Sequence, residues 1–167
     1  MSINQTLKEL PFGFLGQAFC SPLPLSPFFD PEQNLLTAYL NAGVETVVML
    51  IPEEEAQELT GQDLRKRYHE LGLDVIYAPI PDFSVPSPGV LNAPIQQMLH
   101  ALKSGHRIVI HCHAGVGRTG LFAACLAKAA FGFSGPEAIT WVRQYIPDAV
   151  ENSQQYRFVL DFTHQSV

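Results

Sequence analysis

A cysteine and an arginine in one short segment are the residues of this chain best suited to chemistry. Segment 111–120 reads HCHAGVGRTG, between the strand-like run 107–110 and the helix-forming run 121–130. This order predicts that Cys112 lies where a strand ends and a helix begins. Helix N-termini and cationic neighbours lower the pKa of a thiol from about 8.5 to roughly 3.5–7.5. A thiolate is therefore expected at this position, ready to attack phosphorus and form a phosphocysteine.

The backbone around this cysteine is suited to holding an oxyanion. Unpaired N–H groups at a helix N-terminus point toward a bound anion, and the helix dipole adds about half a positive charge. Arg118 supplies a planar fork that matches two phosphate oxygens. The expected phosphate-binding residues are His113, Ala114, Gly115, Val116, Gly117 and Arg118.

Two neighbours of the cysteine have expected supporting roles. Thr119 is expected to donate its hydroxyl to the sulfur, which makes Cys112 a better leaving group in a second step, so it joins Cys112 and Arg118 in the catalytic set. His111 is expected to orient the loop by hydrogen bonding to backbone carbonyls. The alternative for Cys112 is inert packing. The joint pattern of His-Cys, five intervening residues and Arg-Thr-Gly argues against it.

These residues resemble the signature His-Cys-x5-Arg-Ser/Thr of the cysteine-dependent protein tyrosine phosphatase superfamily. Among its branches the chain is most similar to the small dual-specificity enzymes, particularly the cyclin-dependent kinase inhibitor 3-like group. The resemblance is strongest over residues 43–162 and includes Pro79–Ser87 and Glu137–Arg143. It implies a single phosphatase catalytic domain over residues 1–167.

The resemblance also implies a general acid. The leaving oxygen needs a proton, so a carboxylic acid on a separate loop should face the thiolate. Asp82 follows the strand-like run 73–78, precedes a Pro- and Ser-rich segment ending at Pro88, and matches the family's acid position. It would then act as the base on the hydrolytic water. The alternative is that Asp82 only starts a turn, as Asp after Pro often does.

Several other polar residues have two interpretations. His113 either faces the mouth of the pocket or is exposed without a role. Arg143 either braces the catalytic loop or lies on a solvated helix face. Gln155 stands where the family pattern has a glutamine, but a helix surface is the preferred interpretation. Segment 53–55, three glutamates after Pro52, is interpreted as the acidic first turn of a helix.

The leading hypothesis for function is a dual-specificity-type protein phosphatase. No segment resembles the tyrosine-stacking loop of larger tyrosine-specific enzymes, so a shallow pocket is expected to admit phosphoserine and phosphothreonine besides phosphotyrosine. The variable loop positions His113, Ala114 and Val116 include no lysine, which weakens a phosphoinositide substrate without removing it. Two alternatives stay open: a phosphatase for a phosphoinositide or other small phosphoester, and a catalytically weak phosphate-binding module.

Composition restricts the class of protein. The chain has 167 residues, 47% of them hydrophobic, which fits one folded domain and excludes wholesale disorder. Three cysteines argue against a disulfide framework and favour a reducing cytoplasm. The net charge of −6 argues against nucleic acid as a partner. No run approaches the roughly 18 apolar residues of a membrane span. No Cys/His cluster has the spacing of a zinc site, and neither a metal nor another cofactor is expected. The oligomeric state is not predicted.

Strand-like and helix-like runs alternate along the chain. Strands are expected over 44–51, 73–78 and 107–110, with a strand pair within 11–19; helices are expected over 32–41, 62–71, 91–103, 121–130, 134–145 and 153–163. This alternation predicts an α/β fold, in which a central, largely parallel mixed sheet is flanked by helices on both faces. The family resemblance implies the same architecture, that of a dual-specificity phosphatase.

Overall fold

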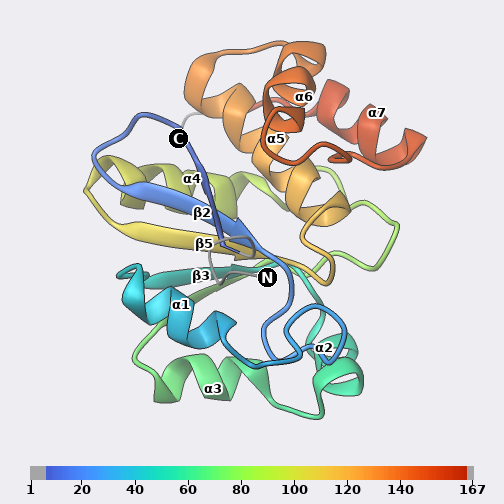
Figure 1. Ribbon diagram of the computed structural model, residues 1–167. Helices are drawn as coiled ribbons and strands as arrows, with labels where there is room; N and C mark the ends of the chain where they lie inside the picture. Colours follow the sequence, from blue (N-terminus) through green and yellow to red (C-terminus); the bar gives the residue numbers. More distant parts are fainter. Residues whose placement is uncertain (1–6, 165–167) are drawn as a thin grey trace.

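The computed structural model describes residues 7–164 and shows a five-stranded sheet between two layers of helices (Figure 1). The strands are β1 (Lys8–Leu10), β2 (Gln17–Ser21), β3 (Thr46–Met49), β4 (Asp74–Tyr77) and β5 (Arg107–His111). Their order in the sheet is β1-β2-β5-β3-β4. Only the pairing of β1 with β2 is antiparallel. The prediction of a largely parallel mixed sheet is therefore confirmed.

Side chains of the central strands alternate between two hydrophobic cores. On β5, Ile108 and Ile110 belong to one core, whereas Val109 belongs to the other. On β3, Val48 shares the first core and Val47 the second. Because successive strand residues point to opposite faces, a strand that is apolar at every position must be covered on both sides.

Helices cover both faces of the sheet, as predicted (Figure 1). One face carries α1 (Leu35–Asn41), α2 (Glu53–Thr60) and α3 (Leu64–Glu70). The opposite face carries α4 (Asn92–Lys103), α5 (Gly117–Phe131), α6 (Gly135–Arg143) and α7 (Ser153–Asp161). Helix α5 lies at the centre of its layer, and its residues from Gly117 to Ala127 are buried.

Local sequence signals account for several helix ends. The Ser134 hydroxyl accepts from the backbone N–H of Glu137, whose carboxylate accepts from the N–H of Ser134, so the predicted capping box opens α6. Helix α2 begins after Pro52 with an acidic first turn and ends at Gly61, whose φ is +70°. These local predictions are confirmed.

The strand pair predicted within residues 11–19 is wrong. The two strands are β1 and β2, and most of that segment forms the connection between them. Pro11 has no N–H to donate to a ladder, which ends β1. Gly16 packs tightly against the segment after α4: its N–H donates to the Leu102 carbonyl, and a Cβ there would clash with the His106 carbonyl.

The fold brings the carboxyl ends of the four parallel strands β2, β5, β3 and β4 to one edge. Strand β5 lies between β2 and β3, parallel to both. The chain leaves β5 toward α5 on one face, while β2 and β3 lead to helices on the other (Figure 1). In open α/β sheets this divergence leaves a crevice where ligands bind. Cys112 is the first residue after β5.

Candidate active site

The expected nucleophile lies in the loop between β5 and α5. This cysteine loop (residues 112–116) holds Cys112 almost fully buried, with 2% of its surface exposed. Gly115 has a φ of +77°, and a Cβ there would come within 2.7 Å of the Ser21 carbonyl oxygen. A side chain would therefore force the loop away from the end of β2. The arrangement of strand, cysteine and helix is the one predicted.

The cysteine loop offers hydrogen-bond donors that the protein does not use. Within residues 7–164, none of the backbone N–H groups of residues 113–118 donates a hydrogen bond to another protein group. All of these residues except Ala114 are buried or half-buried, and N–H groups in such places require a hydrogen-bond partner. They lie just before, or in the first turn of, the 15-residue helix α5, where an anion can supply that partner. The expected phosphate-binding residues thus present free donors and the positive end of a helix dipole at one place.

Thr119 and His111 make the contacts expected of them. The Thr119 hydroxyl donates to the Cys112 sulfur at 3.1 Å. The fully buried His111 ring places Nδ1 3.1 Å from the Cys112 carbonyl oxygen and Nε2 2.7 Å from the Tyr68 hydroxyl. Because a carbonyl only accepts, Nδ1 carries the proton and Tyr68 donates to Nε2. Burial lowers the pKa of His111 from 6.5 to about 4, so the ring is neutral at pH 7.

Arg118 lies in the first turn of α5, and its side chain is 2% exposed. Its Nη1 donates to the Ile80 carbonyl at 2.9 Å and to Glu55 Oε2 at 2.7 Å. Its Nη2 donates to Glu55 Oε1 at 3.0 Å and lies 3.3 Å from Asp82 Oδ1. Burial alone would lower the pKa of Arg118, yet the hydrogen bond to Glu55 and nearby negative charges raise it.

Glu55 is a site residue that sequence analysis missed. It belongs to the acidic first turn of α2. Because acidic residues are common at helix N-termini, its sequence position gave no reason to expect a second role. The signal for its contact with Arg118 lies in topology, because α2 follows β3 and β3 is the neighbour of β5. A second missed carboxylate is Glu151, which lies against Gly117 at the start of α5. Burial, and then the charge of Asp82, raises the pKa of Glu151, while Arg118 opposes the shift.

Asp82 both begins a turn and contacts the buried arginine. Its Oδ1 accepts from the N–H of Phe83 at 3.0 Å and lies 3.3 Å from Arg118 Nη2. Its side chain is 45% exposed. The Asp82 loop (residues 79–90) is tied to the start of α7, where Asn152 Nδ2 donates to the Phe83 carbonyl at 3.1 Å. The Asp82 loop thus contacts the first turn of α5 through Arg118.

The structure shows the environments of three further polar residues that had two interpretations. Arg143 is exposed on α6, yet its Nε and Nη2 donate to the carbonyls of Ala149 and Val150. These two residues pack against Gly120 of α5. The helix-surface prediction for Gln155 is wrong, because this side chain is fully buried. Its Oε1 accepts from the N–H of Glu151 at 2.9 Å. His113 is half-buried and packs its ring against Phe29.

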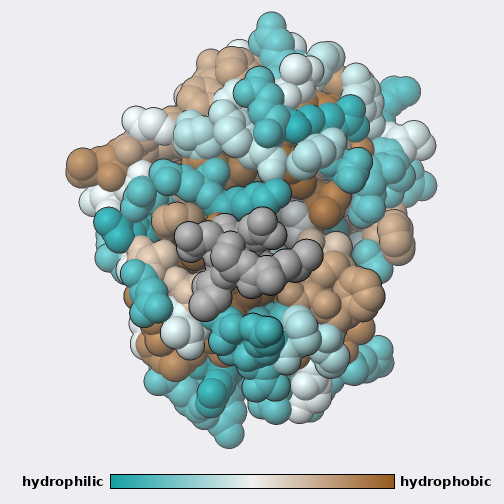
Figure 2. Space-filling model, viewed as in Figure 1, coloured by the Kyte–Doolittle hydropathy of each residue, from teal (hydrophilic) through white to brown (hydrophobic). Residues whose placement is uncertain are grey.

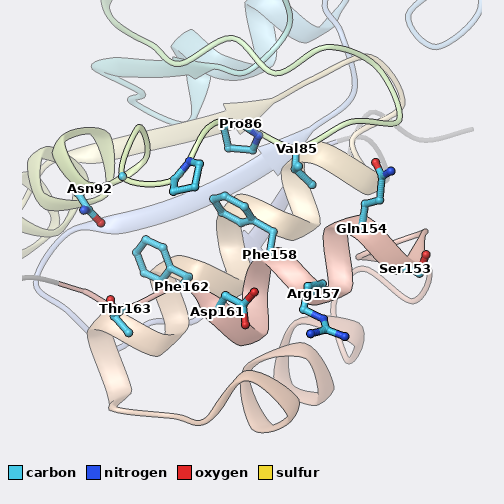
Figure 3. Close-up of a pocket in the computed structure, with 12 residues that line it drawn as sticks. Val85, Pro86, Asn92, Ser153, Gln154, Arg157, Phe158, Asp161, Phe162 and Thr163 are labelled. Atoms are coloured by element: carbon cyan, nitrogen blue, oxygen red, sulfur yellow. The ribbon is translucent and has the colours of Figure 1, made fainter.

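A cavity lies beside this site and not over Cys112. It has a volume of about 940 Å³ and separates the Asp82 loop from α7. Figure 3 shows the ring of Phe158 across the opening from Pro86 and Val85. None of the expected catalytic residues lines it. This cavity is therefore separate from the residues that can do chemistry.

Two further observations concern residues 7–164. No three His, Cys, Asp or Glu side chains in this range come together as metal ligands do. No helix in this range is long and apolar enough to cross a membrane.

Comparison with known proteins agrees with this geometry. The family model described as "Polymorphic toxin system, DSP-PTPase phosphatase" matches residues 29–130, more than half of the chain. Mouse protein tyrosine phosphatase domain-containing protein 1 is 29% identical over 140 residues, covering 79% of this chain and 19% of that protein. Rat cyclin-dependent kinase inhibitor 3 is 27% identical over 154 residues, covering 89% of this chain and 71% of that protein. The chain thus spans about a fifth of the mouse relative.

Solved structures share the fold over most of the chain. Tk-PTP in its active form is 27% identical with a TM-score of 0.75, covering 93% of this chain and 94% of the other. Kinase associated phosphatase, with serine replacing its catalytic cysteine, has a TM-score of 0.83 at 20% identity, covering 92% and 90%. PTPMT1 in complex with PI(5)P has a TM-score of 0.72 at 19% identity, covering 86% and 88%.

The buried neutral His111 predicts a stability that depends on pH. The unfolded chain binds a proton at this residue below about pH 6.5, whereas the folded chain binds it only near pH 4. Folding stability from this group is therefore full above pH 6.5 and is lost as the pH falls toward 4, by about 3 kcal/mol in total. Urea unfolding from pH 7 to 4.5 should show this loss in the wild type and not in His111→Gln. A His111 ring that titrates near pH 6.5 by ¹⁵N NMR would contradict it.

The Arg118–Glu55 pair predicts a phosphate-dependent stability. Glu55→Gln removes the charge that balances a buried guanidinium, so the free energy of unfolding should fall by about 2–4 kcal/mol. Inorganic phosphate should restore more stability to this variant than to the wild type, because a bound oxyanion supplies the missing negative charge. Thermal unfolding with and without phosphate measures both effects. The exposed neighbour Glu54→Gln is the control, and equal behaviour of the two variants would count against the pair.

Proposed function

Because this chain belongs to the DSP-PTPase phosphatase family, we propose that it hydrolyses phosphate monoesters of proteins through a phosphocysteine on Cys112. The observation that carries this proposal is the convergence of two contacts at one sheet edge. Cys112 receives a hydrogen bond from Thr119, and Arg118 lies within 3.3 Å of the carboxylate of Asp82. These are the nucleophile, oxyanion ligand and proton donor that phosphoryl transfer to a thiolate requires.

The reaction would proceed in two displacements. In the first, the Cys112 thiolate forms a bond to phosphorus while the ester P–O bond breaks, and Asp82 gives its proton to the leaving oxygen. Arg118 and the free N–H groups of residues 113–118 hold the non-bridging oxygens as charge develops on them. In the second, Asp82 takes a proton from water, the water oxygen bonds to phosphorus, and the P–S bond breaks. The Thr119 hydroxyl supports the departing sulfur.

Two contacts would keep this machinery in place. His111 would hold the cysteine loop through its bond to the Cys112 carbonyl. Glu55 would hold the guanidinium of Arg118 through two hydrogen bonds, so that the fork does not have to be ordered by the substrate. The alternative of a catalytically weak phosphate-binding module gives no reason for the Thr119 hydroxyl to donate to the Cys112 sulfur.

Protein substrates have support from the relatives and from the cysteine loop. The chain resembles proteins named for tyrosine phosphatase domains, and a zebrafish relative is named dual specificity protein phosphatase CDC14AB. The variable positions of the cysteine loop include no lysine, and the net charge is −6, which disfavours an anionic lipid surface. The fold shared with PTPMT1, solved with PI(5)P, keeps a phosphoinositide substrate as the second candidate.

A matched substrate panel tests this proposal. Phosphate release should be faster for phosphotyrosine, phosphoserine or phosphothreonine peptides than for phosphoinositides and nucleotides. Cys112→Ser should release no phosphate from any of them and should still bind phosphate, because its backbone donors are unchanged. Preference for a lipid or nucleotide would keep the chemistry and overturn the protein substrate. Turnover by Cys112→Ser equal to that of the wild type would overturn the chemistry itself.

The acid role of Asp82 predicts a dependence on the leaving group. Asp82→Asn should lower kcat by about 10²- to 10³-fold for alkyl phosphates, whose alkoxide needs a proton to leave. For aryl phosphates with strongly electron-withdrawing rings the loss should be less than about 10-fold, because those phenolates leave unprotonated. Asp74→Asn, at an exposed position on β4, is the control. Equal losses for good and poor leaving groups would remove Asp82 from the acid role.

A further inference from the structure

The loop between β2 and α1 places aromatic rings beside the cysteine loop. This segment, which we term the aromatic loop (residues 22–34), is joined to the cysteine loop by a hydrogen bond of 2.8 Å from the N–H of Leu23 to the carbonyl of His113. The Phe29 ring meets the His113 ring edge-on, with centroids 5.0 Å apart. The Phe28 ring meets Phe29 in the same manner at 4.8 Å. A row of three rings therefore starts at the residue that follows Cys112.

Buried polar side chains fix the conformation of the aromatic loop. Asp30, 6% exposed, accepts hydrogen bonds from the N–H groups of Leu25, Asn34 and Leu35. Ser26, 1% exposed, accepts from the N–H groups of Phe28 and Phe29. These contacts hold the loop in one shape before any ligand arrives.

The fixed shape of the loop includes strain. Leu25 has a φ of +65°, in the left-handed region that a leucine rarely adopts. Such strain persists where surrounding contacts determine the backbone, and it occurs often at ligand-binding segments. The hydrogen bond from the N–H of Leu25 to Asp30 is one of the contacts that maintain it.

The aromatic loop presents its outermost ring to solvent. Phe28 is 80% exposed, although the polar residues that support it are buried. Figure 2 shows hydrophobic surface over the segment that joins β2 to α1. A second exposed ring follows Asp82 in the chain: Phe83 is 65% exposed and has a φ of +55°. An exposed aromatic ring on a rigid loop that contacts the cysteine loop is suited to hold the group that carries the phosphate.

We propose that Phe28 and Phe29 form an aromatic wall that packs against the aryl ring of phosphotyrosine and gives the site a preference for aryl over alkyl phosphates. This inference rests on the proposed function and names its substrate class. Ring–ring contacts favour a substrate with its own π system, and phosphoserine or phosphothreonine has none. The hydroxyls of an inositol ring would lose water against this wall without gaining a partner. The aromatic loop therefore supplies the ring-binding segment that the sequence did not reveal.

Binding in the Cys112→Ser background tests the wall without interference from chemistry. The probes are two peptides identical except for phosphotyrosine or phosphothreonine, together with inorganic phosphate. Phe28→Ala should weaken binding of the phosphotyrosine peptide by about 3- to 10-fold and change the other two affinities by less than twofold. Phe28→Leu keeps an apolar side chain but loses the ring. It should also weaken binding of the phosphotyrosine peptide and leave the other two affinities unchanged. Leu15→Ala is the matched control, because Leu15 is 81% exposed on the segment before β2, at the opposite end of that strand.

The possible results separate this inference from the proposed function. Equal losses for the two peptides, or no loss for either, would overturn the aromatic wall while wild-type phosphate release still supports the phosphatase. Equal affinity of the Cys112→Ser protein, with Phe28 unchanged, for both peptides would also overturn the aromatic wall. If the wild type hydrolyses neither peptide and prefers a phosphoinositide, the protein substrate fails and the wall fails with it.

Discussion

The structure of this site depends on keeping one positive charge away from water. Arg118 is buried at the start of α5, and its guanidinium is satisfied by groups from separate elements: Glu55 after β3, and Ile80 and Asp82 after β4. A buried guanidinium without partners would cost several kcal/mol. The arginine thus joins α5 to the ends of two neighbouring strands. The same contacts engage both Nη atoms and fix the guanidinium at the start of α5.

The interior of the sheet explains why this edge is rigid. Strand β5 is paired on both sides and carries apolar side chains into two cores, so its carboxyl end has little freedom. His111 extends this order past the strand, because its neutral ring links Tyr68 of α3 to the Cys112 carbonyl. The free donors of the cysteine loop are therefore held by a fixed support, and they need not be ordered by the substrate.

The parts of the site that the sequence predicts correctly are those whose information is local. The run of strand, cysteine, glycines and helix lies within about twenty residues, so its periodicity and turn residues define it, and Thr119 is only one helical turn and a loop away from Cys112. Glu55 and Glu151 were missed because their contacts depend on which strands are neighbours and on how α7 packs. The burial of Gln155 was not predicted, because a short amphipathic helix does not show which of its polar residues is covered by the rest of the protein. The strand pair predicted within residues 11–19 was misplaced because it included Pro11, whereas β1 ends at Leu10.

The unpaired N–H groups of the cysteine loop have a consequence for the catalytic cycle. Donors that find no acceptor within residues 7–164 suit any tetrahedral oxyanion of the right size, whether it is a phosphate ester or free phosphate. If the proposed reaction takes place here, the same donors would bind both the substrate and the released phosphate, and phosphate or sulfate buffers would lower the measured activity.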